Sequence, residues 1–401
     1  MKKAVINTLV QIIGKGITIF ISLLTTGILT RGLGSVAYGQ YILISSSFVF
    51  LDSLADFGIK IMGVKLASED KKKREEIWIQ GAWAKLLMTG VAFVLGLFLI
   101  NLWEGFATIR LEAMVALLMM WFTSVAGSLE IVWQTRMRME KKVIIEVIYP
   151  SIFLLALWQY TGKITLMWVF VTYLLARIIS LSLALLWERK LLAKFSRFDK
   201  EKVKLILRNS WPMGLYLLIF TGYDRAVDSL MLERFLGAKE VAYYGLSYKI
   251  YSSLLQPVYF FVASVFPLLS AKNTNKKRVF GWSALLIALG LIFMMAFTYT
   301  LAPWMVGVLG GAEFEASISI LRILVLAMIF AFYNHLIGFT LISKGGQKTM
   351  LGLGLVVLTF NVSMNLLAIP RFGVVGAAYV TVVTEAISLS LMGWALLRIR
   401  K

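Results

Sequence analysis

The sequence predicts an all-α integral membrane protein of about twelve transmembrane helices, arranged as two pseudo-symmetric six-helix bundles. Three observations lead to this prediction: the apolar composition, the alternation of basic loops and an internal repeat. Of the 401 residues, 59% are hydrophobic and 15% are charged, and the mean hydropathy is +0.82. Soluble domains contain about 45–50% apolar and about 25% charged residues. This composition excludes a water-soluble enzyme and a disordered chain.

Apolar runs separated by polar breaks place the expected spans along the chain. The first run follows Lys2 and Lys3 and ends without a small-residue cleavage site, so we expect a helix and not a removed signal peptide. The expected organisation is an N-terminal bundle over residues 1–190, a cytoplasmic linker over 191–208 and a C-terminal bundle over 209–401. The twelve expected spans lie near residues 7–30, 38–62, 78–100, 112–134, 143–162, 164–187, 209–232, 241–268, 280–302, 316–342, 350–369 and 373–397.

Basic residues alternate from loop to loop. If the N-terminus is inside, the inner loops and termini hold 27 Lys and Arg residues, not counting Lys65 next to the end of span two, and the outer loops hold 6. Cytoplasmic loops are enriched in Lys and Arg, so both termini are expected in the cytoplasm. This bias explains most of the net charge of +20 without a nucleic-acid partner. The chain has no Cys and one His, so neither a disulfide nor a Cys- or His-rich metal site is expected, and no cofactor is expected.

The longest connection, residues 188–208, is basic and cytoplasmic in this topology. It is interpreted either as an orientation-setting linker or as a segment that lies on the anionic inner leaflet. Asp199 is expected to cap a helix over residues 200–207.

Two turns repeat along the chain. Arg31 and Gly34 follow the first span in the pattern Arg-x-Leu-Gly, with Tyr-Gly shortly after, and Arg234 and Gly237 follow the seventh span in the same pattern. The copies are 203 residues apart and separated by six spans, so both halves enter the membrane in the same direction. Transporters built from two parallel bundles have such repeats, whereas the alternative is a chance similarity of two glycine-containing turns. We predict that these four residues form gate turns.

The two turns, together with several other stretches, resemble the Wzx-type polysaccharide-transport flippases of the MATE-like MOP superfamily. The resemblance implies a bacterial inner-membrane protein that moves undecaprenyl-pyrophosphate-linked oligosaccharide units, for O-antigen or a related surface polysaccharide, from the cytoplasmic to the outer leaflet. It also implies a central cavity lined mainly by spans one, two, seven and eight. The supporting stretches are LADFG from Leu54, FPLLS from Phe266, LAP from Leu301, GAEF from Gly311, IPRFG from Ile369 and GAA from Gly376.

Charged residues inside these four spans are candidate site residues, because a charge inside the bilayer costs about 2.5–3.5 kcal/mol on insertion scales. Arg and Lys suit phosphate binding through charge-assisted hydrogen bonds. The predicted pyrophosphate-binding residues are Lys15, Lys60, Arg225 and Lys249. The predicted residues for charge balance or ion coupling are Asp52, Asp56, Asp224 and Asp228.

Spacing within the helices predicts how these charges pair. Lys60 is expected to pair with Asp52 or Asp56 on the same helix face. Arg225 is expected to pair with Asp228, which leaves Lys15 and Lys249 as free cations. The alternative is that all these charges form structural ion pairs.

Other polar residues of the spans are not assigned to the cavity. Tyr243 and Tyr244 are interpreted as membrane-interface residues or as sugar-stacking rings. His335 is interpreted as an interhelical hydrogen-bonding residue or a proton relay. Structural pairing is expected for six charged residues in flanking spans, which are Lys85, Glu130, Glu146, Arg177, Arg322 and Glu385.

The sequence lacks a phosphate-binding Gly-rich loop, a metal constellation and a nucleophile elbow, so no catalytic residue is predicted. A sugar polymerase or ligase would, by resemblance, carry a sizeable outer loop, and none is expected here. The hypothesis is therefore a flippase that works by alternating access. The alternative is a MATE-type cation-coupled multidrug or metabolite exporter, which the basic residues disfavour. The coupling ion, a proton or sodium, and association with a polysaccharide polymerase complex are left open.

Overall fold

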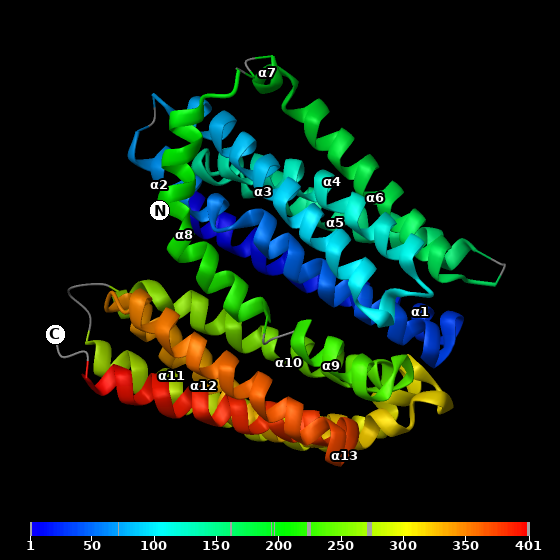
Figure 1. Cartoon of the computed structure of the whole chain (residues 1–401). Coiled ribbons are helices and arrows are strands. Elements are labelled where there is room, and N and C mark those ends of the chain that lie inside the picture. Colours follow the sequence, from blue (N-terminus) through cyan, green and yellow to red (C-terminus); the bar gives the residue numbers. More distant parts are fainter. Residues whose placement is uncertain are drawn as a thin grey trace. The chain divides into compact units, whose positions relative to one another are not determined.

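All regular elements that the computed structural model describes are helices (Figure 1). Eight helices of this part of the chain are long and apolar enough to cross a membrane, as expected of an all-α membrane protein. The structure describes residues 2–70, 72–160, 163–193, 195, 197–222, 226–270 and 275–398, without the side chains of residues 2–8, 267, 270 and 347.

The helices follow the expected spans in order. They are α1 (Lys2–Asp56), α2 (Ile59–Glu69), α3 (Arg74–Leu102), α4 (Arg110–Thr135), α5 (Met139–Gln159), α6 (Leu166–Trp187), α7 (Arg189–Leu192), α8 (Lys200–Thr221), α9 (Val227–Leu236), α10 (Ala238–Ser270), α11 (Lys276–Gly310), α12 (Ala316–Ser343) and α13 (Gln347–Arg398). Short 3-10 turns lie at Glu104–Phe106 and Ala312–Phe314.

Glycine turns separate spans that are otherwise continuous. Gly34 (φ 75°, ψ 173°) divides α1 into spans one and two, and Gly373 (φ 61°, ψ −150°) divides α13 into spans eleven and twelve. Gly237, between α9 and α10, has φ 90° and ψ 174°. Only glycine adopts such positive φ values without strain. The glycines of the two repeated turns therefore share one backbone conformation, as expected of an internal repeat.

The helices group into two compact units. Unit 1 contains Met1–Leu33 and Leu43–Thr221, and unit 2 contains Gly34–Ile42 and Gly222–Lys401. In unit 1, α4 packs against α3 and α6, and α8 packs against α2 and α3. In unit 2, α12 packs against α10, α11 and α13 (Figure 1). Packing thus groups α8, the first part of span seven, with the N-terminal helices. The expected boundary between the two bundles, in the linker over residues 191–208, follows from the sequence repeat and stays a prediction.

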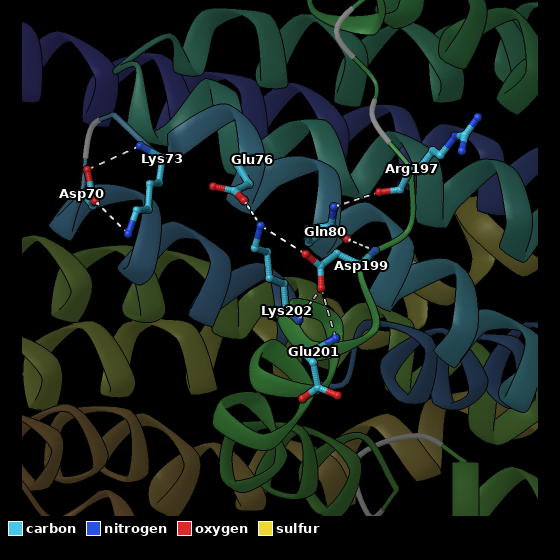
Figure 2. A network of polar contacts seen from close by, with 8 residues as sticks. All are labelled: Asp70, Lys73, Glu76, Gln80, Arg197, Asp199, Glu201 and Lys202. Atoms are coloured by element: carbon cyan, nitrogen blue, oxygen red, sulfur yellow. Dashed lines mark hydrogen bonds and ion pairs between the residues drawn. The ribbon is translucent and has the colours of Figure 1, made fainter.

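The linker between α6 and α8 contacts α3 through Phe195, Arg197 and Asp199. The buried Gln80 amide donates to the Arg197 carbonyl at 3.1 Å and accepts from the Asp199 N–H at 3.0 Å (Figure 2). The Phe195 ring packs against Trp83, with ring centroids 5.5 Å apart. Because one side chain satisfies two backbone groups of the linker, this connection is anchored to unit 1.

Asp199 caps α8, as the sequence predicts. Its carboxylate accepts from the N–H groups of Glu201 and Lys202 at 3.1 and 3.2 Å (Figure 2). The Lys202 side chain pairs with Asp199 at 3.1 Å and also with Glu76 on α3. Hydrogen bonds from the backbone and side chain of Lys202 hold the pKa of the Asp199 carboxyl below its usual range. The capped helix is longer than expected and runs to Thr221.

Candidate functional site

The expected pairing of Lys60 with an acid of its own helix is wrong. The Lys60 ammonium instead lies 3.3 Å from Glu130 on α4. The physical reason is a break in the helix, because Phe57 (φ 39°) and Gly58 (φ 71°) both have positive φ. Helix α1 ends at Asp56 and α2 begins at Ile59, so the acids before the break and Lys60 after it do not share one helix face.

Asp56 pairs with a flanking-span cation. The Lys85 ammonium donates to its carboxylate at 2.7 Å, and both side chains are largely buried, with 6% and 16% exposure. Structural pairing is the role expected for Lys85. Asp52, one turn earlier, is half-buried and interacts electrostatically with both Lys85 and Arg177. The pair is a fixed neutral element of unit 1, because neither charge can leave without stranding the other in an apolar interior.

Glu130 has two cationic partners. Lys60 lies 3.3 Å from it and Lys142 on α5 lies 3.2 Å from it, and Lys142 also pairs with Glu146 at 3.5 Å. The Lys60 side chain is the most exposed of the three that meet at Glu130, at 35%, against 21% for Lys142 and 15% for Glu130. Lys60 can therefore leave Glu130 without leaving that carboxylate unpaired.

Unit 2 contains a buried polar cluster around Asp228, which is 3% exposed. Its carboxylate accepts from the Tyr244 hydroxyl at 2.6 Å and from the Asn365 amide at 2.8 Å. The Tyr244 hydroxyl also lies 2.8 Å from the Thr381 hydroxyl, and Asn365 donates to the Asn361 amide oxygen at 3.2 Å. We call these five residues the Asp228 cluster. A buried carboxylate next to amide and hydroxyl oxygens can take up a proton or hold a small cation.

The Asp228 cluster was only partly visible in the sequence. Asp228 is one of the predicted site residues, but the sequence favours the membrane interface or sugar stacking for Tyr244. Tyr243 and Tyr244 are instead both buried, at 8% and 4% exposure. Asn361 and Asn365 are spaced four residues apart in an otherwise apolar span, and this spacing was the signal that could have identified them.

The other predicted site residues are placed as follows. Lys15 is exposed on α1, and its carbonyl accepts from the Thr18 hydroxyl at 2.9 Å. Lys249 is half-buried on α10 and has an interaction partner, so the expectation that it is a free cation is wrong. Arg225 and Asp224, with their expected contacts, lie outside the described residues.

The first repeated turn, at Arg31–Gly34, is held by residues that the sequence does not assign to a site. The Ser35 N–H, directly after Gly34, donates to the Glu313 carboxylate at 2.9 Å. Hydrogen bonds from the hydroxyl and the N–H of Ser35 hold the pKa of Glu313 below its usual range. Next to this contact, the buried Tyr38 ring packs edge-on against Phe314. Arg31 and Arg234 are both exposed.

The first turn and the start of α10 approach each other closely. A Cβ atom at Gly39 would lie 1.7 Å from the Ala238 carbonyl oxygen, and one at Gly245 would lie 2.9 Å from the Ile42 side chain. In each Tyr-Gly pair of the repeat, the glycine therefore lies where a Cβ atom would collide with the neighbouring segment.

Comparison with known proteins identifies the family. A family model described as "Polysaccharide biosynthesis protein" matches residues 4–273, which is more than half of the chain. The chain belongs to this family. A relative, an uncharacterized membrane protein of Methanocaldococcus jannaschii, is 29% identical over 207 residues. That match covers 47% of this chain and 39% of the relative, so it spans well under half of the relative's length.

Solved structures of the MOP superfamily share the fold of this family member. The lipid II flippase MurJ in an inward closed conformation has a TM-score of 0.75 at 14% identity, covering 98% of this chain and 87% of MurJ. An inward-facing MATE family multidrug resistance transporter has a TM-score of 0.74 at 14% identity, covering 96% and 93%. A MOP superfamily transporter from Pyrococcus furiosus has a TM-score of 0.68 at 13% identity, covering 100% and 96%. The chain is thus a multi-pass membrane protein with a MOP transporter fold.

Proposed function

We propose that this protein is a flippase that moves undecaprenyl-pyrophosphate-linked oligosaccharide repeat units from the cytoplasmic to the outer leaflet by alternating access. Membership of the polysaccharide biosynthesis family and the MOP fold support a transporter in such a pathway. The observation that carries the proposal is the environment of Lys60. It is a half-exposed cation whose acid, Glu130, keeps Lys142 as a second partner.

This arrangement suits a charged lipid that binds transiently. A pyrophosphate group can take Lys60 from Glu130 through charge-assisted hydrogen bonds, and Lys142 then keeps Glu130 neutralised. Lys15, Arg225 and Lys249 are proposed as the further cations along the path. The turns at Arg31, Gly34, Arg234 and Gly237 are proposed as parts of the gates. The protein is proposed to reside in a bacterial inner membrane with both termini in the cytoplasm, because of the loop charges.

Ion coupling is proposed for the Asp228 cluster. The Tyr244 hydroxyl and the Asn365 amide donate to this carboxylate. Uptake of a proton or sodium ion would rearrange these hydrogen bonds, which join α9, α10 and α13. Asp52, Asp56 and Asp224 are proposed to balance charge. A polysaccharide polymerase complex is the proposed consumer of the flipped product.

Proteoliposomes that contain a fluorescent undecaprenyl-pyrophosphate oligosaccharide test the proposal. Wild-type protein should transfer the lipid between leaflets, and Lys60→Gln should slow the transfer at least about 10-fold, the effect of losing one charge-assisted hydrogen bond. Lys65→Gln is the matched control, because Lys65 lies on the same helix and is exposed. Transfer by Lys60→Gln at the wild-type rate would remove Lys60 from the mechanism.

The MATE-type exporter is the second candidate, and three acids of unit 1 argue against it. A cation exporter needs carboxylates that are free to bind its substrate. Asp56, Glu130 and Glu146 each have a lysine partner within 3.5 Å. Export of cationic dyes by the same proteoliposomes, without lipid transfer, would favour the exporter.

A further inference from the structure

Arg177 on α6 has an unusual environment for a cation inside a membrane span. Its guanidinium stacks on the Tyr149 ring at 3.5 Å and lies 5.3 Å from the Tyr173 ring. It donates one hydrogen bond, from Nη2 to the Tyr173 hydroxyl at 3.2 Å. Among the described residues, no carboxylate lies within 4.0 Å of it. The structural ion pair expected for Arg177 is therefore not formed there.

The described residues use only a small part of the hydrogen-bonding capacity of Arg177. A guanidinium has five N–H donors in a fixed planar fork, and a described protein group accepts from one of them. Asp52 interacts with Arg177 electrostatically, without an ion-pair contact. This more distant carboxylate lowers the free-energy cost of burying the positive charge of Arg177, and it does not occupy the N–H donors of the guanidinium.

The side chain lies at mid-depth and on the inner face of its helix. Arg177 is 11 residues from the start of α6 at Leu166, or about 16 Å at 1.5 Å per residue. The exposed stripe of α6 contains Val171, Leu175 and Ile179, and helical geometry places position 177 on the opposite side. Arg177, Tyr149 and Tyr173 are all half-buried. Arg177 therefore lies on the face of α6 turned away from the apolar stripe.

We propose that Arg177, flanked by Tyr149 and Tyr173, binds the phosphate oxygens of an amphiphilic ligand inside unit 1. The planar fork of a guanidinium matches the spacing of two phosphate oxygens, whereas the ammonium group of a lysine does not. The tyrosine rings hold the fork in place and offer apolar faces to the groups next to the phosphate. Resting on the proposed function, the ligand is the pyrophosphate of the lipid-linked substrate. An ordinary phospholipid headgroup has the same chemistry and is the other source of such a ligand.

Binding to the full-length protein in nanodiscs tests this assignment, with undecaprenyl pyrophosphate as the probe and native mass spectrometry as the readout. Wild-type protein should bind the probe, and Arg177→Gln should weaken binding at least about 10-fold, as expected for the loss of charged hydrogen bonds. Arg322→Gln should bind normally. It is the matched control because the Arg322 guanidinium also stacks on a tyrosine, Tyr299, at 4.9 Å.

The outcomes separate this inference from the proposed function. If wild type and Arg177→Gln bind the probe equally, the Arg177 site is wrong and the flippase proposal stands. The wild type could instead bind phosphatidylglycerol in an Arg177-dependent way and not bind undecaprenyl pyrophosphate. Arg177 would then be a binding site for phospholipid headgroups, and the substrate named in the flippase proposal would be wrong. Binding of neither lipid by the wild type would overturn both.

A second variant covers the case in which Arg177→Gln does not fold. Arg177→Lys keeps the charge but loses the planar fork, so it should fold and bind the probe several-fold more weakly. Undecaprenyl pyrophosphate should raise the unfolding temperature of the wild type more than that of Arg177→Lys. If Arg177 has only a structural role, the opposite pattern is expected. Arg177→Lys should then unfold at a lower temperature than the wild type, and the ligand should raise both unfolding temperatures by the same amount.

Discussion

Lys85 and Lys60 have different environments although both are paired with acids in unit 1. The Lys85–Asp56 pair is short and largely buried, at 2.7 Å, whereas Lys60 is one of two cations on Glu130 and is 35% exposed. Removing one member of a buried pair strands the other charge, while removing both is often nearly neutral. We therefore propose a structural role for the Lys85–Asp56 pair and a substrate-binding role for Lys60.

Unfolding measurements in detergent test the structural role of the buried pair. Lys85→Met should lower the free energy of unfolding by about 3–5 kcal/mol, because it leaves Asp56 buried without its cation. The double variant Asp56→Leu/Lys85→Met should recover most of this loss. Lys73→Met, which removes an exposed partner of Asp70 at 3.8 Å, should change stability by about 1 kcal/mol or less. A double variant as unstable as the single one would contradict the assignment.

The Glu313–Ser35 contact should depend on pH. Because the hydrogen bonds from Ser35 lower the folded-state pKa of Glu313, their stabilisation is complete above the unfolded value of about 4.3. It is lost as the pH falls through the lower folded value. Glu313→Ala should therefore destabilise the protein by about 1 kcal/mol at pH 7, discounted for solvent exposure. The difference between variant and wild type should shrink toward pH 3, and a difference independent of pH would exclude the charged hydrogen bond.

At the scale of elements, the close approach at Gly39 gives a direct test of packing. Gly39→Ala should lower stability by about 1–3 kcal/mol, since its Cβ would overlap the Ala238 carbonyl and such overpacking forces the backbone to move. Gly290→Ala on α11 is the control, because a Cβ there meets no atom within 4 Å, and alanine favours helix. Thermal unfolding of both variants measures this, and equal stabilities would contradict the described contact.

The sequence predicted the elements better than the contacts between them. Apolar periodicity and basic loops located the helices, and the repeated turns located Gly34 and Gly237, because these signals are local. The pairing of Lys60 was wrong because two successive positive-φ residues break the helix, which propensity alone does not reveal. The partners of Asp228 and the Tyr149 ring that stacks on Arg177 come from other helices, and no spacing within one helix can identify them. Tyr173, which accepts from Arg177, lies four residues earlier on the same helix.

At the scale of the whole molecule, the loop charges predict the orientation. The chain has no native cysteine, so single cysteines can be introduced without removing others. In intact cells, cysteines at Lys73 and Lys276 should be protected from a membrane-impermeant maleimide, and cysteines at Val36 and Arg110 should react. All four positions are exposed, so access to the reagent decides the result. A reproducible reversal at one position would contradict the proposed topology.

The leaflet distribution of lipid-linked oligosaccharides in a strain that lacks this protein is the direct test of the flippase proposal. The flippase proposal predicts that undecaprenyl-pyrophosphate oligosaccharides accumulate in the inner leaflet and that surface polysaccharide is lost. Wild-type protein and Lys65→Gln should restore the outer-leaflet pool, and Lys60→Gln should not. Oligosaccharides that reach the outer leaflet normally without the protein would contradict the account.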